Sequence, residues 1–229
     1  MSDRLLVATR KGLFDFRRDR AGGWFAPVPA FLGSPVSMCL RDPRDGAIYA
    51  ALDLGHFGVK LHRSDDDGAT WTEIAAPSSA GLDPAEGQTE APSLKLIWCL
   101  ETGAAPGELW AGTIPGGLFH SPDRGETWTL NRGLWDQPTR ASWFGGGYDS
   151  PGIHSICLDP RDPDVIDLAV SCGGVWRTTD AGRSWALATA GMWAAYMPPE
   201  AKDDPAIQDP HRMVRCAAAP DALWAQHHN

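Results

Sequence analysis

An eight-residue motif occurs three times in this chain at a constant interval. The copies are SDDDGATW at residues 64–71, SPDRGETW at 121–128 and TTDAGRSW at 178–185, and they share the pattern Ser/Thr-x-Asp-x-Gly-x-Thr/Ser-Trp. They begin 57 residues apart, and a fixed interval of this size indicates a repeat architecture such as a propeller or a solenoid. We call these three segments the repeat turns.

The recurring residue types of the motif are those of a tight turn. An aspartate carboxylate accepts hydrogen bonds from neighbouring backbone N–H groups, and a glycine allows the positive φ that closes a hairpin. The tryptophan is then expected to start the next strand and to fill the gap between sheets. The shared positions are Asp66, Asp123 and Asp180 (with Asp67 as an alternative in the first copy), Gly68, Gly125 and Gly182, and Trp71, Trp128 and Trp185.

With these three copies, the chain resembles the Asp-box, or BNR-repeat, proteins of the sialidase-like β-propeller family, and in particular their uncharacterised bacterial branch. The resemblance covers nearly the whole chain and implies that the repeated aspartates are structural. It does not extend to the sialidase active site, because the chain has no Arg-Ile/Leu-Pro motif near its start. Arg10, Arg140 and Arg212 match the three sialidase arginines in no residue-by-residue way.

Four strands are expected around each repeat turn, which is the composition of an antiparallel propeller blade. Apolar segments such as LKLIWCLET, ELWAGTI and GGLFHS precede the turn as first, second and third strands. We therefore predict a single all-β propeller domain over residues 1–229. Its blades are blade 1 at about 1–33 without its inner strand, blade 2 at about 34–91, blade 3 at about 92–151, blade 4 at about 152–209 and a partial blade 5 at about 210–229.

This arrangement contains 17 strands and closes no ring cleanly. We expect the chain to be part of a larger ring, as a truncated product would be. The alternatives are four blades with a spare strand, or self-association through an unpaired blade edge. A β-sandwich is the rival architecture, but it would not need three equal intervals.

Composition and charge exclude some partners and compartments. The 25 glycines and 19 prolines, with 43% hydrophobic residues, suit many short strands joined by turns. A net charge of −9 without any run of Lys or Arg argues against nucleic acid and anionic membranes as partners. The start of the chain shows no signal-peptide pattern, and no apolar segment reaches membrane-spanning length, so we expect a cytoplasmic location.

Four of the five cysteines occupy one repeat position. Cys39, Cys99, Cys157 and Cys216 follow one another at intervals of 60, 58 and 59 residues, each within an apolar segment. Equivalent positions in successive blades lie farther apart than the roughly 7 Å between Cα atoms that a disulfide allows. We therefore predict small buried free thiols, which suit a reducing compartment.

The candidate site lies on the face opposite the repeat turns. Three long connections, at roughly 72–92, 129–151 and 186–210, reach this face together with the starts of first strands and the ends of second strands. We expect one polar cluster there, with aromatic loop residues above it. The predicted catalytic residues are His154, His211 and Arg212, and the predicted ligand-binding residues are Lys95, Trp143, Tyr148, Tyr196 and His227.

Histidines that converge in this way can bind a metal, act in acid–base catalysis or be hydrogen-bonded structural groups. We predict neither a metal nor a cofactor. His227 and His228 are adjacent on a strand, so they point to opposite faces and cannot both line one pocket. The carboxylates of Asp53, Glu101, Asp149 and Asp209 are available, but no spacing pairs two of them as a glycosidase requires.

The expected function follows mainly from the family resemblance. It is a carbohydrate-directed hydrolase, or a binder of a saccharide or small anionic ligand, that uses the loop-bearing face. Aromatic side chains can stack on sugar rings, although tryptophans in loops also pin loops onto a core. The alternative is a non-enzymatic scaffold that binds protein.

Overall fold

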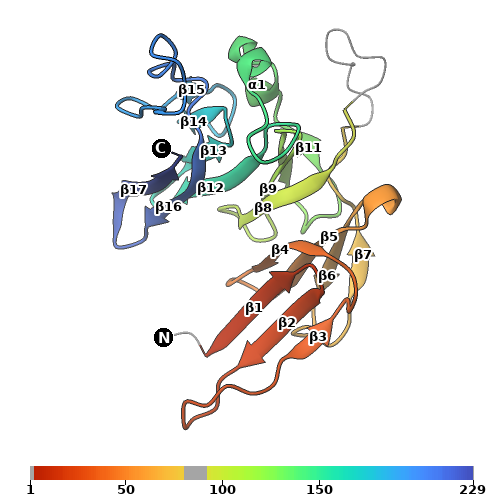
Figure 1. Cartoon of the computed structure of the whole chain (residues 1–229). Coiled ribbons are helices and arrows are strands. Elements are labelled where there is room, and N and C mark those ends of the chain that lie inside the picture. Colours follow the sequence, from red (N-terminus) through yellow and green to blue (C-terminus); the bar gives the residue numbers. More distant parts are fainter. Residues whose placement is uncertain (1–2, 80–91, 229) are drawn as a thin grey trace. The chain divides into compact units, whose positions relative to one another are not determined.

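The computed structural model describes residues 3–79 and 92–228, and these residues form 17 strands in five antiparallel sheets (Figure 1). The first sheet has three strands, β1 (Arg4–Thr9), β2 (Gly12–Arg17) and β3 (Val28–Ala30). The second has four, β4 (Val36–Arg41), β5 (Ile48–Asp53), β6 (Val59–Ser64) and β7 (Thr72–Ile74). The all-β prediction is confirmed, and within the described residues so is the number of strands.

The remaining three sheets have the predicted order. The third contains β8 (Leu96–Thr102), β9 (Leu109–Ile114), β10 (Leu118–Ser121) and β11 (Thr129–Leu130). The fourth contains β12 (Ile153–Asp159), β13 (Asp162–Val170), β14 (Gly174–Thr178) and β15 (Ala186–Leu187), and the last contains β16 (Pro210–Cys216) and β17 (Ala219–His227). Each four-stranded sheet is an up-and-down sheet whose strands pair in chain order, as in a propeller blade.

The chain divides into two compact units, which are described separately below. Unit 1 contains the first two sheets together with Lys95–Ile97, and unit 2 contains the sheets formed from Trp98 onward. The prediction of a single domain over 1–229 stays a prediction. Residues 1–2, 80–91 and 229, and with them part of the first long connection and of the predicted blade boundaries, lie outside the described residues.

The repeat turns join the third and fourth strands of the three four-stranded sheets, as predicted. In the copy between β10 and β11, Ser121 Oγ donates to Asp123 Oδ1 (2.9 Å) and accepts from the N–H of Gly125 (2.9 Å). Asp123 also accepts from the N–H (2.9 Å) and the hydroxyl (2.6 Å) of Thr127. The other two copies repeat this network, with Asp66 and Asp180 as the acceptors. All four interactions lie within seven residues of chain, so the motif forms its turn locally.

The first copy has two aspartates with different roles. Asp66 takes the acceptor role in the turn, whereas Asp67, at a φ of 62°, forms ion pairs with Arg4 and Arg17. Asp67 therefore belongs to a charged cluster of unit 1, and the alternative assignment of the turn role to Asp67 is wrong.

Unit 2 has a continuous apolar core between its sheets. Its fully buried members include Ile153, Leu168 and Trp176, and the repeat-turn residue Trp185 packs with them. Trp185 Nε1 also donates to Asn131 Oδ1 (3.0 Å), and Asn131 caps the short helix α1 (Arg132–Trp135) of the second long connection. The repeat turn of one sheet is thereby tied to the loop that leaves the preceding sheet.

The helical segments among the described residues are all short. Besides α1 they are η1 (Gly55–Phe57) and η2 (Pro138–Ser142). No helix in the described part of the chain combines the length and the apolar character needed to cross a membrane.

The cysteines lie where the intervals predict. Cys39, Cys99, Cys157 and Cys216 belong to the first strands β4, β8, β12 and β16, and these four and Cys172 are free thiols. Cys99 and Cys157 are buried as predicted, and Cys172 is buried too, whereas Cys39 and Cys216 are only half-buried.

Candidate functional site

The candidate site is a cavity of about 640 Å³ in unit 2. It lies at the ends of β12, β13 and β16, where the second and third long connections meet. Its lining residues are Trp98, Phe144, Gly145, Gly146, Gly147, Tyr148, His154, Ser171, Cys172, Tyr196, Asp209, Pro210, His211 and His228.

Asp209 is the buried acidic group of this cavity, with 6% of its surface exposed. Its Oδ1 accepts hydrogen bonds from the Ser171 hydroxyl (3.1 Å) and from the N–H of Cys172 (3.0 Å), which follow β13. Burial and the Asp209 carboxylate raise the pKa of the Cys172 thiol to about 12, so this thiol is neutral at pH 7. The two bonds to Oδ1 leave Oδ2 directed toward the histidines.

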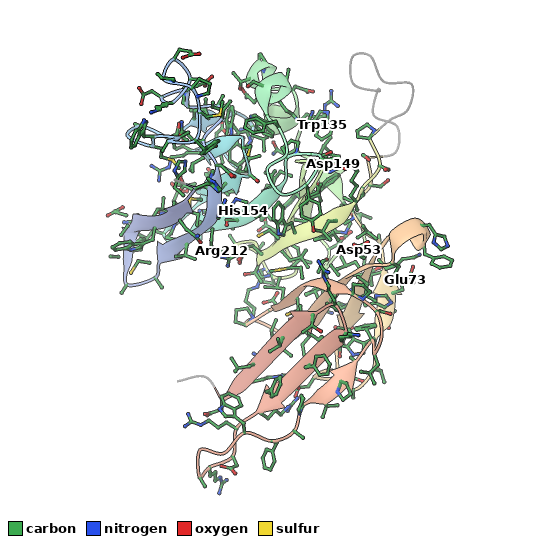
Figure 2. The ribbon with its side chains drawn as sticks, viewed as in Figure 1. Asp53, Glu73, Trp135, Asp149, His154 and Arg212 are labelled. Carbon is green, nitrogen blue, oxygen red and sulfur yellow. The ribbon has the colours of Figure 1, made fainter. Side chains whose placement is uncertain are left out.

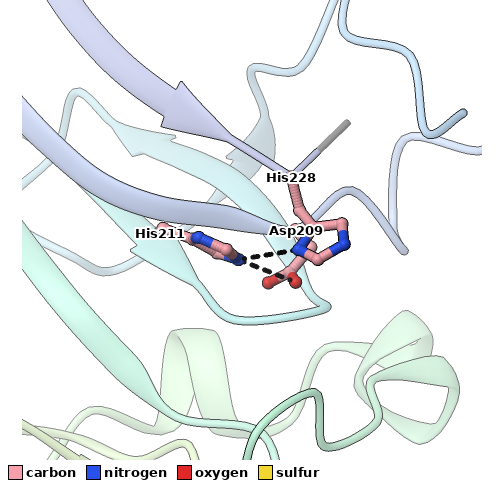
Figure 3. A group of neighbouring side chains, drawn as sticks. All are labelled: Asp209, His211 and His228. Atoms are coloured by element: carbon pink, nitrogen blue, oxygen red, sulfur yellow. Dashed lines mark hydrogen bonds and ion pairs between the residues drawn. The ribbon is translucent and has the colours of Figure 1, made fainter. Parts of the chain in front are cut away.

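His211 and His228 meet at Asp209. His211 Nε2 lies 3.3 Å from Asp209 Oδ2 and 3.2 Å from His228 Nδ1 (Figure 3). Both histidines are exposed toward the cavity, and the Tyr196 ring packs edge-on against His228 with 5.0 Å between ring centroids. This Asp209–His211–His228 group, which we call the His–Asp cluster, is the densest set of titratable side chains in the cavity.

The side chain of His154 links two strands. It lies at the start of β12, and its buried ring donates from Nε2 to the carbonyl of Pro210 (2.6 Å) on the neighbouring β16 (Figure 2). The Ser155 hydroxyl, which accepts from the N–H of Met213 (3.0 Å), completes the arrangement by donating to His154 Nδ1 (2.8 Å). Burial lowers the pKa of His154 to about 4, so the ring is neutral at pH 7 and both its nitrogens are occupied by protein groups.

The loop over the cavity depends on glycine. A Cβ at Gly145 would lie 1.7 Å from the carbonyl oxygen of Tyr148, so no other residue allows this turn. A Cβ at Gly146 would meet Cys172 Sγ at 3.1 Å, which shows how closely the backbone approaches the wall of the cavity. The turn places Tyr148, which is 50% exposed, edge-on against Trp98 with 5.6 Å between ring centroids.

Arg212 lies in a second cavity of unit 2. This cavity has a volume of about 380 Å³, and Glu101, Arg212 and Arg215 contribute its charged groups. Burial raises the pKa of the Glu101 carboxyl to about 7, while the positive charge of Arg212 acts in the opposite direction. The structure thus brings His154 and His211 to one cavity and Arg212 to another.

The five predicted ligand-binding residues lie in different places. Tyr148 and Tyr196 line the cavity. Trp143, with 6% exposure, belongs to the core and packs against Trp176, so it pins its loop down. Lys95 is an exposed residue of unit 1. His227 accepts the N–H of Asp209 (3.3 Å) behind the cavity wall.

Several residues that line the cavity were not assigned to the site from the sequence. Among them are Trp98, Ser171, Cys172, Asp209 and His228. Alternation along the strand predicted that only one of His227 and His228 lines the cavity. This residue is His228, whereas His227 was the residue assigned from the sequence. From the sequence, Asp209 was named only as an available carboxylate. Its hydrogen-bond partners Ser171 and Cys172 are distant in sequence, so these contacts were not predicted.

The comparisons with known proteins give partial matches. No protein-family model matches the chain. Over 169 residues, 69% of the chain, it is 32% identical to a probable oligoxyloglucan-reducing end-specific xyloglucanase of Neosartorya fischeri. Over 123 residues, 53% of the chain, it is 28% identical to the oligoxyloglucan-reducing end-specific xyloglucanase of Emericella nidulans. The matches cover only 19% and 13% of those two proteins.

Solved structures establish the fold. Two YCF48 structures cover all of this chain: YCF48 bound to a D1 peptide (TM-score 0.56, 16% identity, 59% of that chain) and YCF48 from Cyanidioschyzon merolae (TM-score 0.55, 12% identity, 62% of that chain). Virginiamycin B lyase from Staphylococcus aureus has a TM-score of 0.50 at 14% identity and matches 96% of this chain and 61% of its own. With the blade-like sheets, these likenesses identify the chain as β-propeller in fold. The resemblance to Asp-box proteins in particular stays a prediction.

Proposed function

We propose that the cavity of unit 2 binds a saccharide. The observation that carries the proposal is that aromatic rings and polar side chains line the same cavity. Trp98, Tyr148 and Tyr196 offer ring surfaces on which the apolar face of a sugar can pack, and the His–Asp cluster offers donors and acceptors for its hydroxyl groups.

The similarity to two xyloglucanases supports a saccharide over other small ligands. The matched segment covers less than a fifth of either enzyme, so their activity is carried over only as part of this proposal. Xyloglucan oligosaccharides are accordingly the first ligands to test.

The residues that line this cavity fit saccharide binding better than saccharide hydrolysis. Glycosidases generally need two carboxyl groups that flank the scissile bond. Among the described residues that line the cavity, Asp209 is the single carboxylate, and it already accepts two hydrogen bonds through Oδ1. Hydrolysis would need a second acidic group from outside this lining, so we propose a binding site first and a carbohydrate-directed hydrolase second.

The test is isothermal titration calorimetry with xyloglucan oligosaccharides and a panel of simple saccharides. We expect Tyr148→Ala to weaken binding about tenfold, because loss of one stacking ring costs about 1.4 kcal/mol. Tyr148→Phe keeps the ring and should bind like the unmodified chain. Trp193→Ala is the matched control, since Trp193 is an equally exposed loop aromatic that does not line the cavity.

Absence of heat with every saccharide would refute the proposal, as would equal weakening by Tyr148→Ala and Trp193→Ala. Blank saccharide screens would leave the protein-binding scaffold as the better candidate.

A further inference from the structure

We propose that Asp209, His211 and His228 form a binding site for a divalent transition-metal cation of the zinc type. This inference goes beyond saccharide binding and does not depend on it. The three side chains come from the two strands of the last sheet and the residues next to their ends, so one hairpin supplies all three ligands.

Two of the distances between the ligand atoms match those of a tetrahedral site. His211 Nε2 lies 3.3 Å from Asp209 Oδ2 and 3.2 Å from His228 Nδ1, and all three atoms lie within 4.8 Å of one another (Figure 3). Zinc bonds of about 2.0 to 2.1 Å at tetrahedral angles separate neighbouring ligand atoms by about 3.3 to 3.4 Å. Both distances from His211 Nε2 therefore equal the separation of two ligand atoms on one zinc ion, and the 4.8 Å limit keeps the third atom within reach of the same ion.

Hydrogen bonding alone satisfies this geometry poorly. A neutral imidazole carries one hydrogen, so His211 Nε2 can donate to Asp209 or accept from His228, but one hydrogen cannot serve both contacts. If Nε2 accepts from His228, its lone pair is used and the Asp209 carboxylate has no donor in this contact; if Nε2 donates to Asp209, His228 Nδ1 can at most share the same hydrogen. A cation bound between the three atoms would accept a lone pair from each of them, so every atom would have a partner.

The surroundings of Asp209 support a ligand role. Its Oδ1 is held by the Ser171 hydroxyl and the N–H of Cys172, and its own N–H bonds to His227. Outer contacts of this kind orient ligating carboxylates in metal sites. Three protein ligands also leave a fourth position open toward the cavity, as in catalytic zinc sites.

The ligand types select among cations. Two imidazoles and one carboxylate suit zinc, cobalt, nickel and iron, whereas magnesium and calcium prefer sites made of oxygen alone. We expect Zn²⁺ to bind with a 1:1 stoichiometry, and a hundredfold excess of Mg²⁺ not to compete.

The experiment titrates the full chain, without a histidine tag and without saccharide, with Zn²⁺ by calorimetry and with Co²⁺ by visible absorption. His211→Ala and His228→Ala should each weaken Zn²⁺ binding at least tenfold and abolish the Co²⁺ bands of a four-coordinate site. Ser171→Ala should weaken binding about tenfold without abolishing it, since such outer contacts typically contribute 10- to 100-fold. Exposed His56 lies outside the cluster, so His56→Ala is the matched control and should bind like the unmodified chain.

Asp209→Asn keeps the shape of the side chain and removes its charge, and we expect it to weaken binding as strongly as His211→Ala. Circular dichroism checks that each variant is folded. If Asp209→Asn does not fold, the two exposed histidines still decide the question. A chain that binds no Zn²⁺, or that binds it equally after His211→Ala and His228→Ala, would overturn the site, whatever the outcome with saccharides.

Discussion

At the scale of single residues, Glu101 and His154 show how burial sets charge. Both side chains lose water when unit 2 folds, and burial disfavours the charged form of each. The pKa of Glu101 accordingly rises to about 7, and that of His154 falls to about 4. The two shifts have opposite directions because one group is charged when deprotonated and the other when protonated.

Glu101 leads to a pH prediction. Its pKa is higher in the folded chain than in the unfolded chain, so the folded state retains its proton more tightly and stability falls as the pH rises from about 4.5 through 7. Glu101→Gln should remove this loss and be more stable than the unmodified chain at pH 8, by on the order of 3 kcal/mol. Urea unfolding at pH 5 and pH 8 measures the difference.

The control for this prediction is Glu200→Gln, which removes one carboxylate from an exposed position. An equal gain in both variants would mean that net charge, rather than burial of Glu101, is responsible.

At the scale of elements, the repeat turns depend on two successive residues with positive φ. In the third copy these are Ala181, at a φ of 57°, and Gly182, at a φ of 85°. Side chains with a Cβ adopt this region at a cost of roughly 1–2 kcal/mol, which the hydrogen bonds of the turn offset at Ala181. A Cβ at Gly182 would in addition lie 2.5 Å from Asn131 Nδ2.

We therefore expect opposite effects of two neighbouring substitutions. Gly182→Ala should lower the free energy of unfolding by about 2 kcal/mol or more, because strain adds to the displacement of Asn131. Ala181→Gly should leave it unchanged or raise it by up to about 1 kcal/mol, since glycine relieves the strain. Chemical denaturation of the two variants in parallel tests this pair, and a similar loss in both would show that the φ angles do not control the turn.

At the scale of the whole molecule, the propeller repeats place one thiol in the first strand of four successive sheets. Of these thiols Cys99 and Cys157 are the most deeply buried. Burial raises the pKa of Cys157 to about 11 and that of Cys99 further still. Both are therefore protonated at neutral pH and are poor nucleophiles.

Alkylation with iodoacetamide at pH 8, followed by mass spectrometry, tests this arrangement. In the folded chain we expect Cys99 and Cys157 to react at least about 100-fold more slowly than in the denatured chain, because both the thiolate population and access are reduced. The half-buried Cys216 is the internal reference. Equal rates for all three would contradict the packing, and an unreacted pair joined by a disulfide would contradict the free thiols.

The sequence by itself determined the sheets of this protein. Each repeat turn closes through contacts within seven residues, so the motif and its interval were enough to predict where the strands lie, including the three strands of the first sheet and the two of the last. The free thiols followed from the same interval. Short-range contacts of this kind depend little on the rest of the chain, and they can therefore be predicted without it.

Only the tertiary structure decided the site. Asp209 reaches Ser171 and Cys172 across 38 and 37 residues of sequence, and His211 meets His228 through the pairing of β16 with β17. One cluster of His154, His211 and Arg212 was expected because all three lie at the starts of neighbouring first strands, but the adjacent side chains of His211 and Arg212 line different cavities. Contacts between residues that are distant in sequence follow from packing, which no local pattern encodes. The sequence therefore pointed to His154, His211, Tyr148 and Tyr196, which line the cavity, but not to the contacts of Asp209 and His228.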